Sequence, residues 1–176
     1  MADGEFKHAH AAFDRPRVDY PPVPNPRKPK LKVPPGAWDT HFHIIGPPQK
    51  FPYLDSLNYF SPAAPLEHYL NLQEVLGFER GVVVQSRIHG VDPAVLIDAI
   101  RRSEGRFKGV IRSNPNLDAA DLKRLHAAGI RGMRIELSQK LGGSYDKTYF
   151  DRAIKQAADL DWVVALHLDP ASIASL

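Results

Sequence analysis

Apolar and polar positions along residues 36–176 follow two different periods, and the pattern predicts strands separated by helices. Short apolar or β-branched runs bounded by turn residues predict five strands, at Ala37–Ile45, Gly81–Gln85, Phe107–Arg112, Gly132–Leu137 and Trp162–Leu168. Between these runs, apolar residues recur at helical spacing, as in Leu96, Ile97 and Ile100. Strands that alternate with helices predict an α/β fold with a parallel sheet and right-handed crossovers.

Capping residues indicate where the helices begin and end. Asp92 and Pro93 place a capping carboxylate and a first-turn proline before one helix, and Gly105 follows its end. Asp118 opens the next helix, and Gly129 closes it. Two further helices have an apolar stripe, formed in one by Leu66, Leu70 and Leu76 and in the other by Phe150, Ile154 and Ala157.

The length of 176 residues limits the architecture. A closed (β/α)₈ barrel of the TIM type needs roughly 250 residues, so a barrel of this chain would be incomplete, with about five β/α units. An open doubly wound sheet fits the length, but it should then carry a glycine-rich phosphate-binding turn after an early strand. Neither GxGxxG nor GxxxxGK[ST] occurs in the sequence, which weakens nucleotide binding.

Residues 1–35 differ in composition from residues 36–176. They hold eight of the 16 prolines, and seven Lys and Arg against four acids, whereas the remainder carries equal numbers of each sign. Because proline disfavours helices and central strands, we predict an extended basic arm over residues 1–35 and a barrel domain over residues 36–176. The arm could dock on an anionic surface through RKPKLK, but its composition favours a solvated leader. The balanced body argues against nucleic-acid binding.

Composition excludes several other classes. The chain is 43% hydrophobic, enough for a packed core, and it has no cysteine, which excludes disulfides, thiolate zinc sites and a cysteine nucleophile. No apolar run reaches the length of a membrane span, and the first residues lack the apolar segment of a secretory signal. We therefore expect a cytoplasmic protein without membrane contact.

The end of the first predicted strand carries the clearest indication of chemistry. Side chains alternate along a strand, so Asp39, His41 and His43 should share one face. Two imidazoles two residues apart can converge on one cation or on one substrate oxygen. In a barrel, the carboxyl ends of the strands carry the catalytic groups. A chance His-x-His is the alternative, but the preceding aspartate and the following GPP turn favour function.

The first-strand segment DTHFHIIGP resembles the amidohydrolase superfamily, and more narrowly its branch of 2-pyrone-4,6-dicarboxylate lactonase-like hydrolases. The resemblance covers about residues 36–170. It continues through FPY at 51–53, VVVQ at 82–85, HGVD at 89–92, LHAAGIRGMR at 125–134 and WVV at 162–164. It implies a (β/α)₈ barrel that hydrolyses a small anionic cyclic ester, a lactone bearing carboxylate, in the catabolism of aromatic compounds.

The resemblance also implies roles for individual residues. His41 and His43 would polarise the lactone carbonyl, either directly or as ligands of a divalent metal such as zinc, and both options stay open. Arg134 and Glu136 share the inner face of the fourth strand. Arg134 matches an arginine that holds a substrate carboxylate, for which its planar fork is suited. An internal ion pair with Glu136 is the alternative.

Four more residues match or replace family substrate contacts. Tyr59 matches a substrate-contacting tyrosine. Lys140 stands in place of a second arginine, keeping the charge but not the fork. After the second strand, the register decides whether Ser86 or Arg87 faces the pocket. His167 lies near a tyrosine position, and it either lines the pocket or is a satisfied core histidine. These departures favour a cyclic carboxylate other than the pyrone dicarboxylate.

The chain lacks two groups that the resemblance implies, a later histidine and a water-activating aspartate. We therefore expect little or no hydrolase activity from these 176 residues alone. The open edge of an incomplete barrel predicts self-association. Outside the site, His89 should order the loop after the second strand. Two alternative functions remain: a metal-dependent, non-oxidative decarboxylase of aromatic carboxylates, and a non-catalytic, truncated interaction module.

Overall fold

The computed structural model describes residues 22–57, 59, 61–138 and 143–173, and it has the predicted alternation of strands and helices. All neighbouring strands pair in parallel, in the order β1-β2-β3-β4-β5. The elements in chain order are β1 (Trp38–Phe42), α1 (Leu66–Leu76), β2 (Arg80–Val84), the 3₁₀ helix η1 (Arg87–His89), α2 (Ala94–Arg102), β3 (Phe107–Arg112), α3 (Ala119–Ala127), β4 (Ile130–Glu136), α4 (Lys147–Asp159), β5 (Val163–His167) and α5 (Pro170–Ile173).

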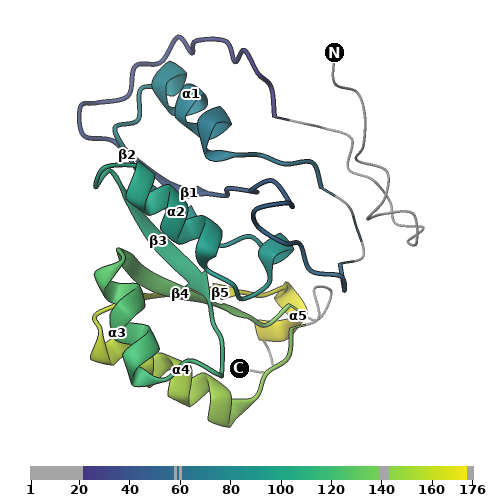
Figure 1. Ribbon diagram of the computed structural model, residues 1–176. Helices are drawn as coiled ribbons and strands as arrows, with labels where there is room; N and C mark the ends of the chain where they lie inside the picture. The colour runs from purple at the N-terminus through teal and green to yellow at the C-terminus, as the bar shows by residue number, and fades with distance from the viewer. Residues whose placement is uncertain (1–21, 58, 60, 139–142, 174–176) are drawn as a thin grey trace.

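The sheet curls into a half-barrel with helices on its outer side. Helix α2 packs against β2 and β3, α3 packs against β4, and α4 packs against β4 and β5 (Figure 1). Strand order that follows chain order is the order of a barrel, and a doubly wound sheet would reverse direction at a switch point. This confirms the predicted incomplete (β/α)₈ architecture. None of the described helices is long and apolar enough to span a membrane.

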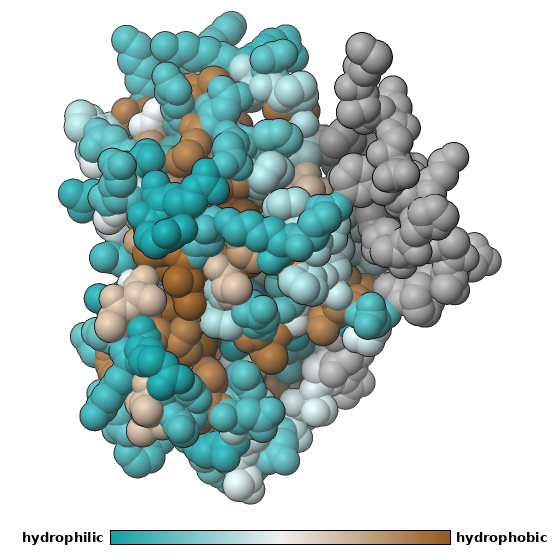
Figure 2. Space-filling view, in the orientation of Figure 1, coloured by the Kyte–Doolittle hydropathy of each residue, from teal (hydrophilic) through white to brown (hydrophobic). Residues whose placement is uncertain are grey.

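The hydrophobic core lies between the sheet and these helices. Side chains of the central strands are almost completely removed from solvent there, and they include Phe107, Ile111, Ile130 and Ile135. Each large apolar side chain buried in this way contributes roughly 1.5–3 kcal/mol. One residue of a predicted apolar stripe is not buried: Ile154 is 37% exposed, whereas α4 buries Ala153 and the predicted Ala157. The surface in Figure 2 is mostly hydrophilic, with apolar side chains visible between the elements.

Local capping follows the predicted pattern. The Asp92 carboxylate accepts a hydrogen bond from the Ala94 N–H at 2.9 Å, at the start of α2. Asp118 and Asp121 form a reciprocal capping box at the start of α3, with donor–acceptor distances of 2.7 and 3.2 Å. Gly129, after α3, has a φ of +100°, a backbone conformation that side chains disfavour. The helix boundaries were therefore predictable from local chemistry.

A bulge in β1 corrects the prediction that Asp39 shares a face with the two histidines. Asp39 pairs with Gly81 and Phe42 pairs with Val83, so three steps along β1 match two along β2. Asp39 and Phe42 therefore both face the helices. The Tyr69 hydroxyl of α1 donates to the Asp39 carboxylate at 3.0 Å, and its ring stacks on Phe42 with 3.5 Å between centroids. Asp39 thus holds α1 against the sheet.

The described part of the N-terminal arm, residues 22–35, forms neither helix nor strand and contacts α1. The Asn71 side-chain amide donates to the Pro24 carbonyl at 3.0 Å. A methyl group on Gly77 would lie 3.2 Å from the Val33 side chain, which shows how closely the two segments approach. This part of the arm is therefore packed on the domain.

Candidate active site

The carboxyl ends of the strands bring together most of the residues that the sequence singled out. In a parallel sheet these ends meet at one edge, where barrel enzymes carry their catalytic groups. Charge interactions connect the side chains across four strands. We call this group the strand-end cluster, and it consists of His41, His43, Tyr59, Arg87, Arg112, Arg134, Glu136 and His167.

His41 of β1 and His43, the residue that follows β1, lie side by side. Their ring centroids are 5.1 Å apart and the rings are nearly perpendicular, at 87°. His43 Nδ1 lies 2.7 Å from the Val84 carbonyl oxygen. Because a carbonyl can only accept, Nδ1 carries the proton and Nε2 of the neutral ring carries the lone pair. His43 is therefore oriented by the backbone of β2.

The environment of His43 favours its neutral form. Part of the ring is open to solvent, but burial of the remainder lowers the pKa of His43 below its usual value. The hydrogen bond to Val84 opposes this shift, and the nearby Arg134, His41 and His167 lower the pKa further. Arg134 therefore lies near enough to His43 for its charge to act from β4 on the residue that follows β1.

Arg134 is only 9% exposed, and its guanidinium is incompletely paired. One terminal nitrogen donates to the Gln85 carbonyl oxygen at 3.2 Å, whereas Nε is buried and has no hydrogen-bond partner among the described residues. Burial lowers the pKa of Arg134, and the charge of Glu136 partly offsets this. A buried cation with an unused donor suits an incoming carboxylate.

The alternative role of Arg134, a direct ion pair with Glu136, does not match the contacts of that carboxylate. Glu136 accepts a hydrogen bond from the Ser138 N–H at 3.2 Å, and its other oxygen lies 3.1 Å from His167 Nδ1. His167 thus lies beside the acid of the neighbouring strand, in a partly exposed position. Glu136 acts on Arg134 through its charge.

The loop after β2 decides between Ser86 and Arg87. The Ser86 hydroxyl accepts from the Ile88 N–H at 3.3 Å and so caps η1. Arg87 lies close enough to Arg112 for its charge to lower the Arg112 pKa. Arg87 therefore belongs to the cluster, and Ser86 has a structural role. The predicted contact Lys140 lies outside the described residues.

Gln85 is a structural residue of the site that the sequence did not single out. It is completely buried, and its amide nitrogen donates to the Gly90 and Asp92 carbonyls at 3.1 and 2.8 Å. Its side-chain oxygen accepts from the Arg112 N–H at 2.9 Å. Gln85 therefore holds the loop after β2 against the end of β3. The sequence did contain a signal for this role, because Gln85 is the polar residue that ends the apolar run VVVQ.

Arg112 is the second residue that sequence reasoning missed. It pairs in register with Arg134 across β3 and β4. Burial lowers the pKa of Arg112, and the charge of Arg134 lowers it further, while Glu136 acts in the opposite direction. The available signal was an arginine at the carboxyl end of a predicted strand, near the position that Arg134 has in the next strand.

His89 has the structural role that the sequence predicted. It is buried, and its Nε2 accepts from the Gly46 N–H at 3.1 Å. Its Nδ1 lies 3.2 Å from the Pro52 carbonyl and donates to it. Both ring nitrogens are thus used to join the loop after β1 to η1, and burial lowers the pKa of His89.

Two properties of the histidine pair bear on metal binding. The hydrogen bond from His43 Nδ1 to a backbone carbonyl is the arrangement that commonly orients a metal-ligating histidine. Catalytic zinc normally has three protein ligands, and the described residues contain no group of three His, Asp or Glu suited to hold a metal. A site with three protein ligands that includes His41 and His43 would therefore need a third ligand that the described residues do not supply.

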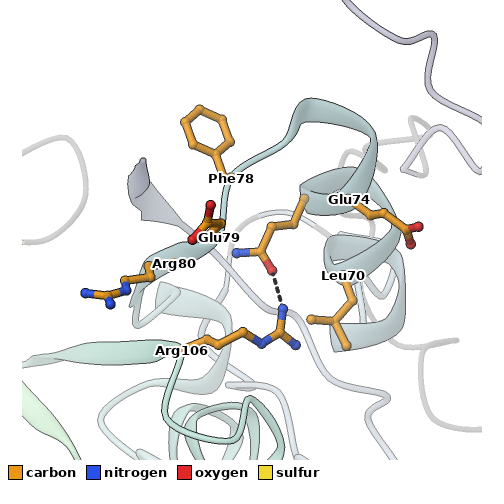
Figure 3. A pocket seen from close by; sticks show the side chains of 7 residues that line it. Leu70, Glu74, Phe78, Glu79, Arg80 and Arg106 are labelled. Atoms are coloured by element: carbon orange, nitrogen blue, oxygen red, sulfur yellow. Dashed lines mark hydrogen bonds between the residues drawn. The ribbon is translucent and has the colours of Figure 1, made fainter. Parts of the chain in front are cut away.

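One cavity lies away from the strand-end cluster, and another is lined by one residue of the cluster. One of about 540 Å³ lies at the amino-terminal ends of β2 and β3, where Arg106 donates to the Gln73 side chain at 3.2 Å (Figure 3). In barrels that end contributes to stability and not to chemistry. The other, of about 600 Å³, lies between residues 22–27 and α1, and His43 is one of its lining residues.

Comparison with known proteins identifies the family. A family model described as amidohydrolase matches residues 38–175, which is most of the chain. The chain belongs to the amidohydrolase family. This amidohydrolase is 42% identical over 148 residues to the 4-sulfomuconolactone hydrolase of Hydrogenophaga intermedia, a match that covers 84% of this chain and 49% of the relative. It is 34% identical to the 2-pyrone-4,6-dicarboxylate hydrolase of Comamonas testosteroni, over 86% of this chain and 50% of that one.

The solved structures agree with the fold of this amidohydrolase. A probable 2-pyrone-4,6-dicarboxylic acid hydrolase from Acinetobacter baumannii, solved with citric acid bound, superposes with a TM-score of 0.71 at 23% identity. The match covers 80% of this chain and 52% of that one. The chain thus spans about half the length of the relatives it matches.

Proposed function

We propose that the protein hydrolyses a small lactone that bears at least one carboxylate. The observation that supports this proposal is the contact between the rings of His41 and His43, together with the charge of Arg134 that acts on His43. The names of the two relatives, both lactone or pyrone hydrolases, support the same reaction class. The chain spans only about half the length of each relative, so the activity is stated here as a proposal.

The arginine and its neighbours would bind the substrate. The unused Nε of Arg134 can donate to a carboxylate, and burial strengthens this interaction by excluding water. Tyr59 lies close enough to act on the charge of Arg134, and it would contact the same end of the ring. The remaining proposed contacts are Arg87, His167 and Lys140.

The two histidines would act at the lactone carbonyl. Water adds to the carbonyl carbon and loses a proton to a base outside the described residues. The ring C–O bond then breaks, and the ring oxygen takes a proton. Neutral His43 offers a lone pair at Nε2, which can bind a divalent ion, whereas direct polarisation of the carbonyl requires the imidazolium. A bound zinc ion would supply Lewis-acid polarisation of that carbonyl.

The test compares the 176-residue chain with the longest product of its reading frame, on a panel of carboxylated lactones with and without zinc. We expect ring opening by the longer product. His43→Gln should lower kcat by about 10²–10³-fold, the effect of losing one oxyanion-stabilising group. Arg134→Gln should mainly raise KM, by about 10–100-fold. His68→Gln, at an exposed position of α1, is the control.

Three outcomes would contradict this proposal. Release of carbon dioxide from aromatic carboxylates without ring opening would favour a decarboxylase. Equal activity of His43→Gln and His68→Gln would remove the histidine pair from the mechanism. No turnover of any lactone by the longest product, with a stop codon directly after Leu176, would favour a non-catalytic module.

A further inference from the structure

Two arginines lie next to each other at the carboxyl ends of β3 and β4. Arg112 and Arg134 are partners in the parallel ladder, and residues that pair in this way point to the same face of the sheet. Like charges at adjacent positions repel each other, and each guanidinium is at least partly buried. A fold retains such a pair only where something offsets its charge.

The hydrogen bonds of the described residues leave both arginines incomplete. The NH1 group of Arg112 and the Nε of Arg134 are buried, and neither has a partner in the described part of the chain. Glu136 is the carboxylate whose charge stabilises both guanidinium groups, but its oxygens contact Ser138 and His167. Buried donors without partners are rare and costly, so these two donors are well placed to bind an anionic ligand at the strand ends.

A third cation adds to this excess of positive charge. Arg87, at the start of η1, is close enough to act on Arg112. Three guanidinium groups, from η1, β3 and β4, are thus linked by their charges, and Glu136 is the acid that acts on two of them. A single substrate carboxylate would pair with one guanidinium group, and the positive charge of the neighbouring guanidinium would stay uncompensated.

We propose that Arg112 binds a second anionic group of the substrate and so determines specificity for dianionic over monoanionic ring acids. Arg134 holds the first group, and Arg112 holds the other through the buried NH1 that has no partner among the described residues. This inference deepens the proposed function, because it concerns the same site. It rests on the site being a substrate site, but it requires no particular reaction.

The test measures anion binding, so that it can fail or succeed independently of turnover. Succinate and butyrate are the probes, because both have four carbons and they differ by one carboxylate. Each is titrated into the longest product of the reading frame, with heat or NMR shifts as the readout. We expect succinate to bind at least tenfold more tightly than butyrate. Arg112→Gln should remove this preference and leave butyrate binding unchanged, whereas Arg134→Gln should weaken both.

Two further variants separate binding from folding and from net charge. Arg112→Lys keeps the positive charge but loses the planar guanidinium with its paired donors, so this variant should retain part of the preference for succinate. Arg101→Gln removes the same charge from an exposed position of α2, and it should change neither affinity. If Arg112 were only structural, its replacement would lower the unfolding midpoint and leave the ratio of the two affinities unchanged, which would overturn the proposal. An equal loss of succinate affinity in Arg101→Gln would also overturn it.

Discussion

At the residue scale, hydrogen-bond partners separate structural from candidate catalytic histidines. His89 is buried, and both of its ring nitrogens form hydrogen bonds, one with the Gly46 N–H and one with the Pro52 carbonyl. His43 donates a hydrogen bond from Nδ1 to a backbone carbonyl, and part of its side chain is open to solvent. The two histidines belong to the same fold and both have a lowered pKa, but only His43 faces other charged groups of the cluster.

The role of His89 predicts a pH-dependent stability. Its pKa is lowered in the folded chain, so between that value and about 6.5 the unfolded chain binds more protons. The stabilisation is therefore complete above about pH 6.5, and it is lost as the pH falls through the folded pKa. His89→Gln should lower the free energy of unfolding by about 1–3 kcal/mol at pH 7.5, and by less at pH 5.5.

Urea denaturation at both pH values measures this difference. His68→Gln is the matched control, because His68 is exposed on α1 and its replacement should leave the pH dependence of the wild type unchanged. A stability difference between wild type and His89→Gln that is the same at pH 7.5 and 5.5 would rule out the titration of His89 as its cause.

At the element scale, local chemistry predicted the helices well and the first strand less well. The caps at Asp92 and Asp118 act within three residues of the sequence, so they could be recognised without a fold. The bulge in β1 depends on how β1 pairs with β2, and strict alternation could not foresee that Asp39 turns toward α1. Gln85 and Arg112 were missed for the same reason, because their partners come from other elements.

The capping box of α3 gives a prediction at this scale. Asp118→Ala removes the acceptor of the Asp121 N–H, and it should lower the free energy of unfolding by about 1 kcal/mol. Asp151→Ala is the control, since Asp151 forms an exposed i,i+4 ion pair with Lys147 that should contribute less than about 0.5 kcal/mol. Urea denaturation of both variants is the measurement. Equal losses in the two variants would contradict a specific capping effect.

At the scale of the whole molecule, the half-barrel has two edge strands in its described part, β1 and β5. A strand edge offers unpaired backbone groups to another chain. Val163 and Leu166 of β5 are also 67% and 41% exposed, which makes that edge apolar. Self-association of the 176-residue chain stays a prediction, and we expect β5 to be the edge that pairs.

This edge can be tested by sedimentation of the 176-residue chain. We expect concentration-dependent oligomers, and Val163→Lys should shift the distribution toward monomer, because a charged edge disfavours strand pairing. Val91→Lys, at a 46% exposed position in the turn before α2, is the control and should leave the distribution unchanged. A stable monomer at all concentrations would contradict the prediction, as would an equal effect of both lysine variants.

The sequence by itself determined the order and type of the elements, the family resemblance and the His-x-His and Arg134 positions. These follow from periodicity, capping and short motifs, which act over a few residues. The tertiary structure decided which side chains lie together: it paired Arg112 with Arg134 across two strands, turned Asp39 toward α1 and gave Ser86 a structural role. Strand pairing and burial set these relations, because they depend on partners that lie up to about 50 residues apart along the chain, such as Gln85 and Arg134.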